Sequence, residues 1–155
     1  MLVYRLTTPA FAGDLSGLGA KRFGGRWNSP GNSMVYCGGS ISLCALELAC
    51  NSNGISSINT LQLCCLKLDE KVQIESISLS DLPIGWQQYP APESTKFIGD
   101  QWIQNYSSLV LKVPSCIIPR EFNYILNPLH PKFAKQVAIN WIEPFNLDPR
   151  LVQSV

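Results

Sequence analysis

The feature that most constrains the fold is a series of short apolar runs spread along almost the whole chain. Turns rich in Gly, Pro, Asn and Ser separate these runs, which is the pattern of β-strands. We predict strands within residues 3–7, 34–37, 61–68, 72–79, 108–115, 117–128 and 136–141. Short strands with a few inserted helices predict an α+β fold with a mixed or antiparallel sheet, and argue against a βαβ array.

Two segments between the strands have helical character. ISLCALELAC (41–50) follows Ser40, a good N-cap, and residues 51–54 supply a stop. This helix is apolar nearly all round, so we expect it to be buried on most faces. A second helix is predicted at 97–106. We predict a long, shaped loop at 11–33 and a Pro-rich connection at 81–96; long loops in small domains are usually functional.

Length and composition narrow the class of protein. The chain has 155 residues, 46% of them hydrophobic and 15% charged, with a net charge of +1. We expect a single domain over 1–155, with its core at about 3–152. The near-neutral charge argues against direct nucleic-acid binding, and the apolar content against disorder. We predict no membrane span, because no run of about 20 apolar residues occurs. Arg5 interrupts any secretory signal, so we expect a cytoplasmic protein.

Cysteine and histidine give no metal or disulfide pattern. The six cysteines form no CxxC pair, and several lie among Leu, Ile and Ala, so we expect reduced structural thiols and no metal site. The single histidine, His130, lies in the turn NPLHP, where a structural role is expected. A Cys–His enzyme is an alternative on paper, but no cysteine has a context that favours it.

Glu47 is the only Asp, Glu, Lys, Arg or His between Arg26 and Lys67, and it falls in the most apolar predicted helix. Burying a carboxylate without a partner costs several kcal/mol, so we expect it either to become neutral or to have a partner. Acidic groups in such settings are frequent at active sites. The alternative is that one edge of the helix is exposed and Glu47 faces water; periodicity does not decide between the two.

Four other residues carry candidate chemistry. Arg26 follows two glycines and precedes Trp27; a guanidinium suits phosphate oxygens, and an indole offers a flat wall to a ligand. No dinucleotide or P-loop fingerprint opens a helix here. Tyr36 can stack on a heterocycle or bond a sugar, and Ser115 can point into a cleft. Three of them also have a purely structural interpretation: Arg26 as an exposed residue of a turn, Tyr36 as a core residue and Ser115 as a turn former.

Several blocks, in order, resemble the RES domain family over about residues 3–152. They are GLGAKRFGGRWNSPGNSMVYCGGSISLCALELA, LP-x-GW, IGDQWI, LVLKVPS, EFNYILNPLHP and FNLDPRL. The family name refers to arginine, glutamate and serine, which the resemblance places at Arg26, Glu47 and Ser115. It adds Tyr36 as a functional position and, less directly, Arg5 as a nucleotide-binding position.

The resemblance implies a bacterial toxin of a type II toxin–antitoxin system with an ADP-ribosyltransferase-like fold. Such toxins consume NAD+ by glycohydrolysis or phosphorolysis, or transfer ADP-ribose to a protein. The implied partners are NAD+ and an Xre-type helix-turn-helix antitoxin, with a homodimer inside the complex as one arrangement. Glu47 would stabilise charge on the nicotinamide ribose and Arg26 would bind the pyrophosphate. Tyr36 would pack on nicotinamide or its ribose, and Ser115 would fix the ribose or orient the nucleophile.

Three rival functions stay open from the sequence. The same site could transfer ADP-ribose to a protein side chain instead of water or phosphate. The fold could serve as a catalytically silent interaction module. An RNA-cleaving toxin is weakened by the near-neutral charge and the lone histidine.

Overall fold

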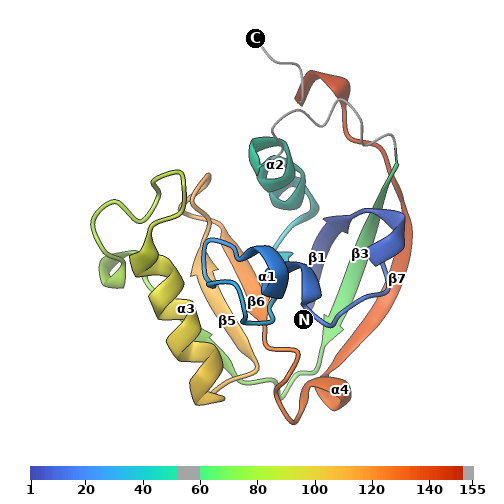
Figure 1. Ribbon diagram of the computed structural model, residues 1–155. Coiled ribbons are helices and arrows are strands. Elements are labelled where there is room, and N and C mark those ends of the chain that lie inside the picture. Colours follow the sequence, from blue (N-terminus) through green and yellow to red (C-terminus); the bar gives the residue numbers. More distant parts are fainter. Residues whose placement is uncertain (52–59, 152–155) are drawn as a thin grey trace.

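A single mixed sheet of seven strands runs through the computed structural model, which describes residues 1–51 and 60–151 (Figure 1). The strand order is β4-β5-β6-β2-β1-β3-β7. Only the β4–β5 pair is parallel; the other neighbours are antiparallel. The strands are β1 (Leu2–Thr7), β2 (Val35–Gly38), β3 (Leu61–Leu68), β4 (Ile74–Ser76), β5 (Val110–Pro114), β6 (Phe122–Leu126) and β7 (Val137–Phe145). The expected α+β class is confirmed.

Four α-helices occur in the described residues: α1 (Leu18–Phe23), α2 (Ile41–Asn51), α3 (Glu93–Asn105) and α4 (Phe133–Gln136). Short 3-10 turns are η1 (Pro9–Phe11), η3 (Leu79–Asp81) and η4 (Pro149–Leu151). Helix α2 packs against β1 and β2. Helix α3 lies along the β5–β6 half of the sheet, where Trp102 and Ile103 join a cluster with Leu111 and Ile125 (Figure 1).

Strand β3, which lies next to the edge strand β7, is among the most buried strands of the sheet. It is hydrogen-bonded to β1 on one side and β7 on the other, and Leu63, Cys64, Cys65 and Leu66 are each at most 2% exposed. A continuous apolar run is what a strand covered on both faces requires.

All six cysteines lie in the described part of the chain and are free thiols. None of the described helices is long and apolar enough to cross a membrane.

Several predicted elements are confirmed, including the cap of α2. The backbone N–H of Leu43 donates to Ser40 Oγ at 3.1 Å, as an N-cap requires. The predicted stop of this helix falls largely on residues 52–54, outside the described residues. The expectation that α2 is buried on most faces is wrong, because within its described side chains only Leu43, Cys44 and Ala45 are buried. The other faces border a cavity and solvent.

Three element boundaries differ from the predictions. The segment 11–33 is not a continuous loop, because it contains α1, which ends where Gly24 adopts φ +73°. Glycine-rich composition hid this short helix, since each glycine lowers the helical signal. The predicted strand at 72–79 shrinks to Ile74–Ser76 because β4 is an edge strand with a neighbour on one side only. Helix α3 begins at Glu93, inside the predicted connection.

Candidate active site

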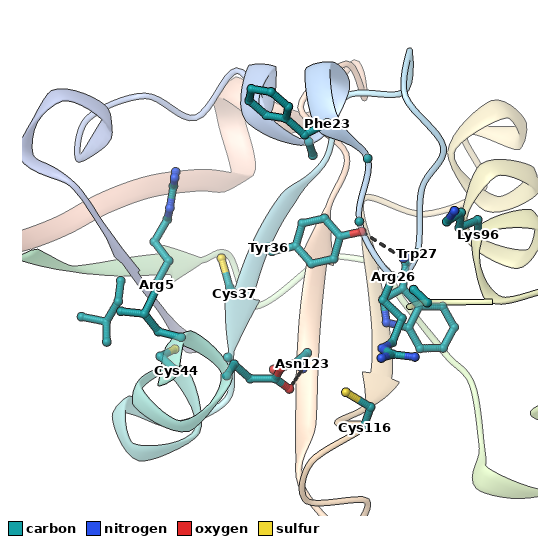
Figure 2. Close-up of a pocket in the computed structure, with 18 of the residues that line it drawn as sticks. Arg5, Phe23, Arg26, Trp27, Tyr36, Cys37, Cys44, Lys96, Cys116 and Asn123 are labelled. Carbon is teal, nitrogen blue, oxygen red and sulfur yellow. Dashed lines mark hydrogen bonds between the residues drawn. The ribbon is translucent and has the colours of Figure 1, made fainter. Parts of the chain in front are cut away.

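A cavity of about 640 Å³ lies beside α1 and α2, over the strands β1, β2 and β6 (Figure 2). Its volume falls in the range of small-molecule sites, about 300–1,000 Å³. Most of the residues singled out from the sequence line it: Arg5, Arg26, Trp27, Tyr36 and Glu47. These residues come from β1, β2, α2 and the segment after α1, so the fold brings together positions that are distant in sequence. Ser115 is not among the lining residues.

Glu47 is half-buried on α2 and is held by two donors on one oxygen. Ser115 Oγ donates to Glu47 Oε1 at 2.8 Å, and Asn123 Nδ2 donates to the same oxygen at 2.7 Å. Of the two alternatives that the sequence left open, the structure shows the carboxylate with polar partners at the wall of the cavity. Bonds to a charged acceptor are stronger than neutral ones, so this arrangement fixes the orientation of the carboxylate.

Ser115 lies behind Glu47, at the end of β5. The residue is 0% exposed, and its Oγ also accepts the backbone N–H groups of Ile117 (3.1 Å) and Ile118 (3.2 Å). The hydroxyl therefore connects the turn after β5 to the carboxylate. Its contacts are with Glu47 and with the backbone of the turn, so it combines a turn-forming role, one of the two interpretations that the sequence left open, with a contact to the site.

Asn123 is a site residue that sequence reasoning missed. It lies on β6 opposite Val113 and Gly38, lines the cavity, and bonds Glu47. A signal for it existed: asparagine is disfavoured inside strands, so an asparagine within the apolar run FNYIL calls for another reason. Figure 2 shows Asn123 on the floor of the cavity, on the opposite side from Phe23.

Arg26 lines the cavity but also ties down the connection before α3. Its Nη1 donates to the carbonyl oxygens of Trp86 (2.6 Å) and Gln88 (3.1 Å). In Figure 2 the guanidinium lies near Cys116. Burial and the nearby Glu47 carboxylate raise the pKa of the Cys116 thiol, and Arg26 opposes that shift. The guanidinium thus adds positive charge to the same side of the cavity while holding the 86–88 segment in place.

Tyr36 offers its ring to the cavity and uses its hydroxyl elsewhere. The hydroxyl donates to Asn28 Oδ1 at 2.8 Å and accepts the Trp27 N–H at 3.1 Å. Burial raises the pKa of Tyr36, so the phenol stays protonated. A Cβ atom at position 25 would lie only 2.7 Å from this hydroxyl oxygen, which is too close, and this explains why the residue before Arg26 is a glycine. Trp27 is only 2% exposed and packs mainly in the core, so it is not the open flat wall that the sequence suggested.

The cavity is cationic among its described lining residues. Arg5, Arg26 and Lys96 line it, and Glu47 is the only carboxylate that does. Arg5 Nη1 donates to the backbone oxygen of Asp14 at 2.7 Å, and hydrogen bonds from Ser16 together with the charge of Arg5 lower the pKa of the Asp14 carboxyl. Lys96 Nζ is paired with Glu93 Oε1 at 2.6 Å, but neither Asp14 nor Glu93 lines the cavity. Clefts lined by one sign of charge attract ligands of the opposite sign. A mostly positive cavity with one fixed carboxylate suits a phosphate-bearing ligand.

The remaining sequence candidates lie outside this arrangement. His130 is not among the described lining residues, and its Nδ1 accepts the backbone N–H of Lys132 at 3.2 Å, which is a structural contact. Within residues 1–51 and 60–151, no group of three or more His, Cys, Asp or Glu side chains is arranged to hold a metal ion.

The fold and the cavity define a class: an α+β protein with one fixed carboxylate in a cation-lined ligand site. Comparison with known proteins gives the family within that class. The chain belongs to the RES domain family, whose model matches residues 2–148.

Two curated relatives are similar over nearly the whole chain. One is the "Toxin Res" of Yersinia enterocolitica serotype O:8 / biotype 1B (strain NCTC 13174 / 8081), 35% identical over 97% of this chain and 99% of the relative. Another is the "Prs ADP-ribosylating toxin" of Sphingobium sp. (strain YBL2), 35% identical over 92% of this chain and 89% of the relative.

A solved structure, that of the M.tuberculosis MbcT-MbcA toxin-antitoxin complex, has a chain with a similar fold. The TM-score is 0.75 and the sequence identity 18%, over 97% of this chain and 86% of that chain. At this identity the likeness concerns the fold. It extends over the same sheet and helices that surround the cavity.

Proposed function

We propose that this chain is the toxin of a type II toxin–antitoxin system and that it depletes NAD+ by cleaving the nicotinamide–ribose bond. The observation that carries the proposal is Glu47, fixed through one oxygen by Ser115 and Asn123 at the wall of a cation-lined cavity. Membership of the RES domain family and the toxin names of its relatives support the same function.

One carboxylate is sufficient for this chemistry. When the bond between nicotinamide N1 and ribose C1′ breaks, the electron pair returns to the pyridinium ring and neutral nicotinamide leaves. An ordinary glycosidase needs an acid to protonate its leaving group and a second carboxylate, but nicotinamide needs no proton. Positive charge develops at C1′, where a carboxylate already held in position stabilises it without reorganisation. Water then adds at C1′ and releases one proton; inorganic phosphate would instead give the 1-phosphate.

The other residues have supporting roles in this proposal. Arg5, Arg26 and Lys96 supply positive charge for the two phosphates of NAD+, and the Tyr36 ring packs on the nicotinamide riboside. Ser115 and Asn123 are positioning residues, because the contacts that support their role are with Glu47. The residues fit NAD+ as a substrate in charge and in the size of the cavity.

The decisive experiment replaces Glu47 by glutamine. Glu47→Gln keeps an oxygen that can accept both hydrogen bonds, so the fold should persist while the negative charge is lost. We expect the rate of NAD+ loss, followed with purified protein, to fall at least about 100-fold. Glu70→Gln makes the same chemical change at an exposed turn and should leave the rate unchanged. A Glu47→Gln protein that consumes NAD+ at the parental rate would refute the proposal.

Transfer of ADP-ribose to a protein is a second candidate, favoured by the relative named Prs ADP-ribosylating toxin. The same bond breaks, but a side chain of the target protein takes the place of water. Incubating lysate with isotopically labelled NAD+ separates the two reactions. Free labelled ADP-ribose, or its phosphate, indicates NAD+ depletion, whereas label on a protein in the mass spectrum indicates transfer.

The partner in this proposal is an Xre-type helix-turn-helix antitoxin that suppresses the activity in the cytoplasm. A similar fold occurs in a solved toxin-antitoxin complex, which supports such a partner. A homodimer of this chain within the complex is part of the proposal. Inducing the chain with and without the adjacent gene, and measuring cellular NAD+, tests it; NAD+ should fall only when the adjacent gene is absent.

A further inference from the structure

Phe23 is the most exposed aromatic side chain of the described residues, at 78%. It nevertheless lines the cavity that contains Glu47. An aromatic ring in water forgoes the hydrophobic gain of burial, so a large exposed ring at a cavity suggests that a ligand covers it. Tyr89, 72% exposed, lines the same cavity from the connection before α3, whereas the exposed ring of Phe97 does not line it.

The backbone that carries Phe23 is held firmly. Phe23 is the last residue of α1, and the helix end is fixed by Gly24 N–H donating to the Ala20 oxygen at 2.8 Å. Buried Asn28 donates through Nδ2 to the same oxygen at 2.9 Å, and Gly31 N–H donates to the Lys21 oxygen at 2.7 Å. The ring is therefore mounted on a fixed base, which lowers the entropic cost of ligand contact.

Phe23 lies at the end of the cavity away from the carboxylate. Figure 2 shows it on the opposite side of the cavity from Asn123, which bonds Glu47. It also lines an adjoining hollow of about 320 Å³. Arg5 lines both spaces, so a cation lies at the boundary between them. The guanidinium carbon of Arg22 is 6.0 Å from the centre of the Phe23 ring.

We infer that Phe23 is the stacking platform for the adenine ring of NAD+, an inference that rests on the proposed function. NAD+ has a flat base at each end and two phosphates in the middle. With the nicotinamide ribose at Glu47, the adenine extends toward the opposite end of the cavity, where the Phe23 side chain is 78% exposed. The pyrophosphate then lies between them, beside Arg5. Base–aromatic stacking tolerates any flat base and needs no hydrogen bond.

The test compares NAD+ turnover and ADP binding in matched variants of the full chain. Phe23→Ala removes the ring, Phe23→Trp keeps an aromatic face, and Phe97→Ala removes an exposed ring outside the cavity. ADP contains the adenine and both phosphates but no nicotinamide, and its affinity is measured by calorimetry without turnover. We expect Phe23→Ala to raise the KM for NAD+ and the Kd for ADP together, by about 5- to 100-fold. Its kcat should stay within about twofold, because binding far from the reacting bond is lost equally from ground and transition states.

The outcomes separate this inference from the proposed function. Phe23→Trp and Phe97→Ala should resemble the parent. If the parent consumes NAD+ but Phe23→Ala leaves both KM and the ADP Kd unchanged, the inference fails and the proposed function stands. A raised KM with unchanged ADP affinity also overturns it, since adenine would then lie elsewhere. If the parent does not consume NAD+, the proposed function fails. In that case the affinity of the parent and of Phe23→Ala for ADP still tests whether Phe23 stacks on adenine. A parent protein that does not bind ADP would refute this inference as well.

Discussion

At the scale of single residues, the candidate site is organised around one oxygen atom. Ser115 and Asn123 reach Glu47 Oε1 from neighbouring strands, β5 and β6, while Glu47 itself comes from α2. Helix and sheet are thereby connected at the point where the proposed chemistry takes place. A carboxylate fixed in this way needs little rearrangement as charge develops on a substrate.

Replacing Asn123 by aspartate tests this arrangement. Asn123→Asp changes a donor 2.7 Å from Glu47 into a second carboxylate. Two carboxylates that share a site repel each other and retain one proton to higher pH. We therefore expect the acidic limb of the pH–rate profile for NAD+ loss to move to higher pH, with kcat reduced about tenfold or more near neutrality. A merely structural role for Asn123 would lower the yield of folded protein without moving the profile.

Asn140→Asp provides the control for that experiment. Asn140 is exposed on β7 and makes only a long contact with Cys65 Sγ, 3.8 Å. The same amide-to-carboxylate change there should leave the pH profile in place. An unshifted profile in Asn123→Asp, with a normal fold, would show that Asn123 does not position the Glu47 carboxylate for the proposed reaction.

How well single residues could be predicted depended on how much each stands out from its local sequence. Glu47 stood out because its helix is otherwise apolar, so its chemistry was visible without a structure. Asn123 was missed because its importance comes from pairing in the sheet, which places it beside α2. The place of Trp27 was equally hard to predict, because local sequence does not show that an aromatic residue at the cavity is also 2% exposed and part of the core.

At the scale of elements, α1 and the segment after it are assembled around Asn28. This residue is 0% exposed and donates through Nδ2 to the backbone oxygens of Ala20, Ser29 and Asn32. Its Oδ1 accepts the Tyr36 hydroxyl, so one side chain links α1 to β2. Phe23 and Tyr36, which line the cavity, are both held by this connection.

Removing that side chain should destabilise the protein measurably. Asn28→Ala leaves the Tyr36 hydroxyl without its acceptor and the Asn32 carbonyl oxygen without the amide donor, whereas the Ala20 oxygen keeps the Gly24 N–H. Each buried unsatisfied group costs about 1–3 kcal/mol. We expect the free energy of unfolding, from urea titration, to fall by about 3 kcal/mol. Asn140→Ala, at an exposed position, should change it by less than about 0.5 kcal/mol. Equal stabilities for the two variants would contradict this account of α1.

The elements themselves were predicted unevenly, for physical reasons. Strands β1, β2, β3, β5 and β6 were found because strand residues buried in a sheet must be apolar over a short run. Helix α1 was missed because its fixation comes from Asn28 and the backbone around it, and because its six residues lie between Gly17 and Gly24 in a glycine-rich segment. The strand order was not predictable, because it depends on long-range pairing such as that of β2 with β6.

At the scale of the whole molecule, the central strands and α2 bury weakly acidic groups beside the cavity. Burial raises the pKa of Cys37 and Tyr36 on β2, and it raises the pKa of Cys44 on α2 from 9.0 to about 11. The Cys44 thiol also donates to the Tyr4 oxygen at 3.1 Å. Each group is neutral in the folded protein at a pH where it would already ionise in the unfolded chain, so folding and ionisation oppose each other.

The stability of the protein should therefore fall above about pH 9. An acid whose pKa is higher in the folded state binds its proton more tightly there, so its contribution is complete below pH 9 and is lost as the pH rises through 11. For Cys44 alone the expected loss of unfolding free energy is about 2 kcal/mol by pH 11.

Urea titrations at pH 8, 9.5 and 11 measure this loss in the parent and in Cys44→Ser. The serine hydroxyl does not ionise in this range but can still donate a hydrogen bond. Because other groups titrate equally in both proteins, the gap between their unfolding free energies should shift by about 2 kcal/mol in favour of the serine variant. Two curves that stay parallel would mean that the Cys44 thiol ionises as readily in the folded protein as in the unfolded chain.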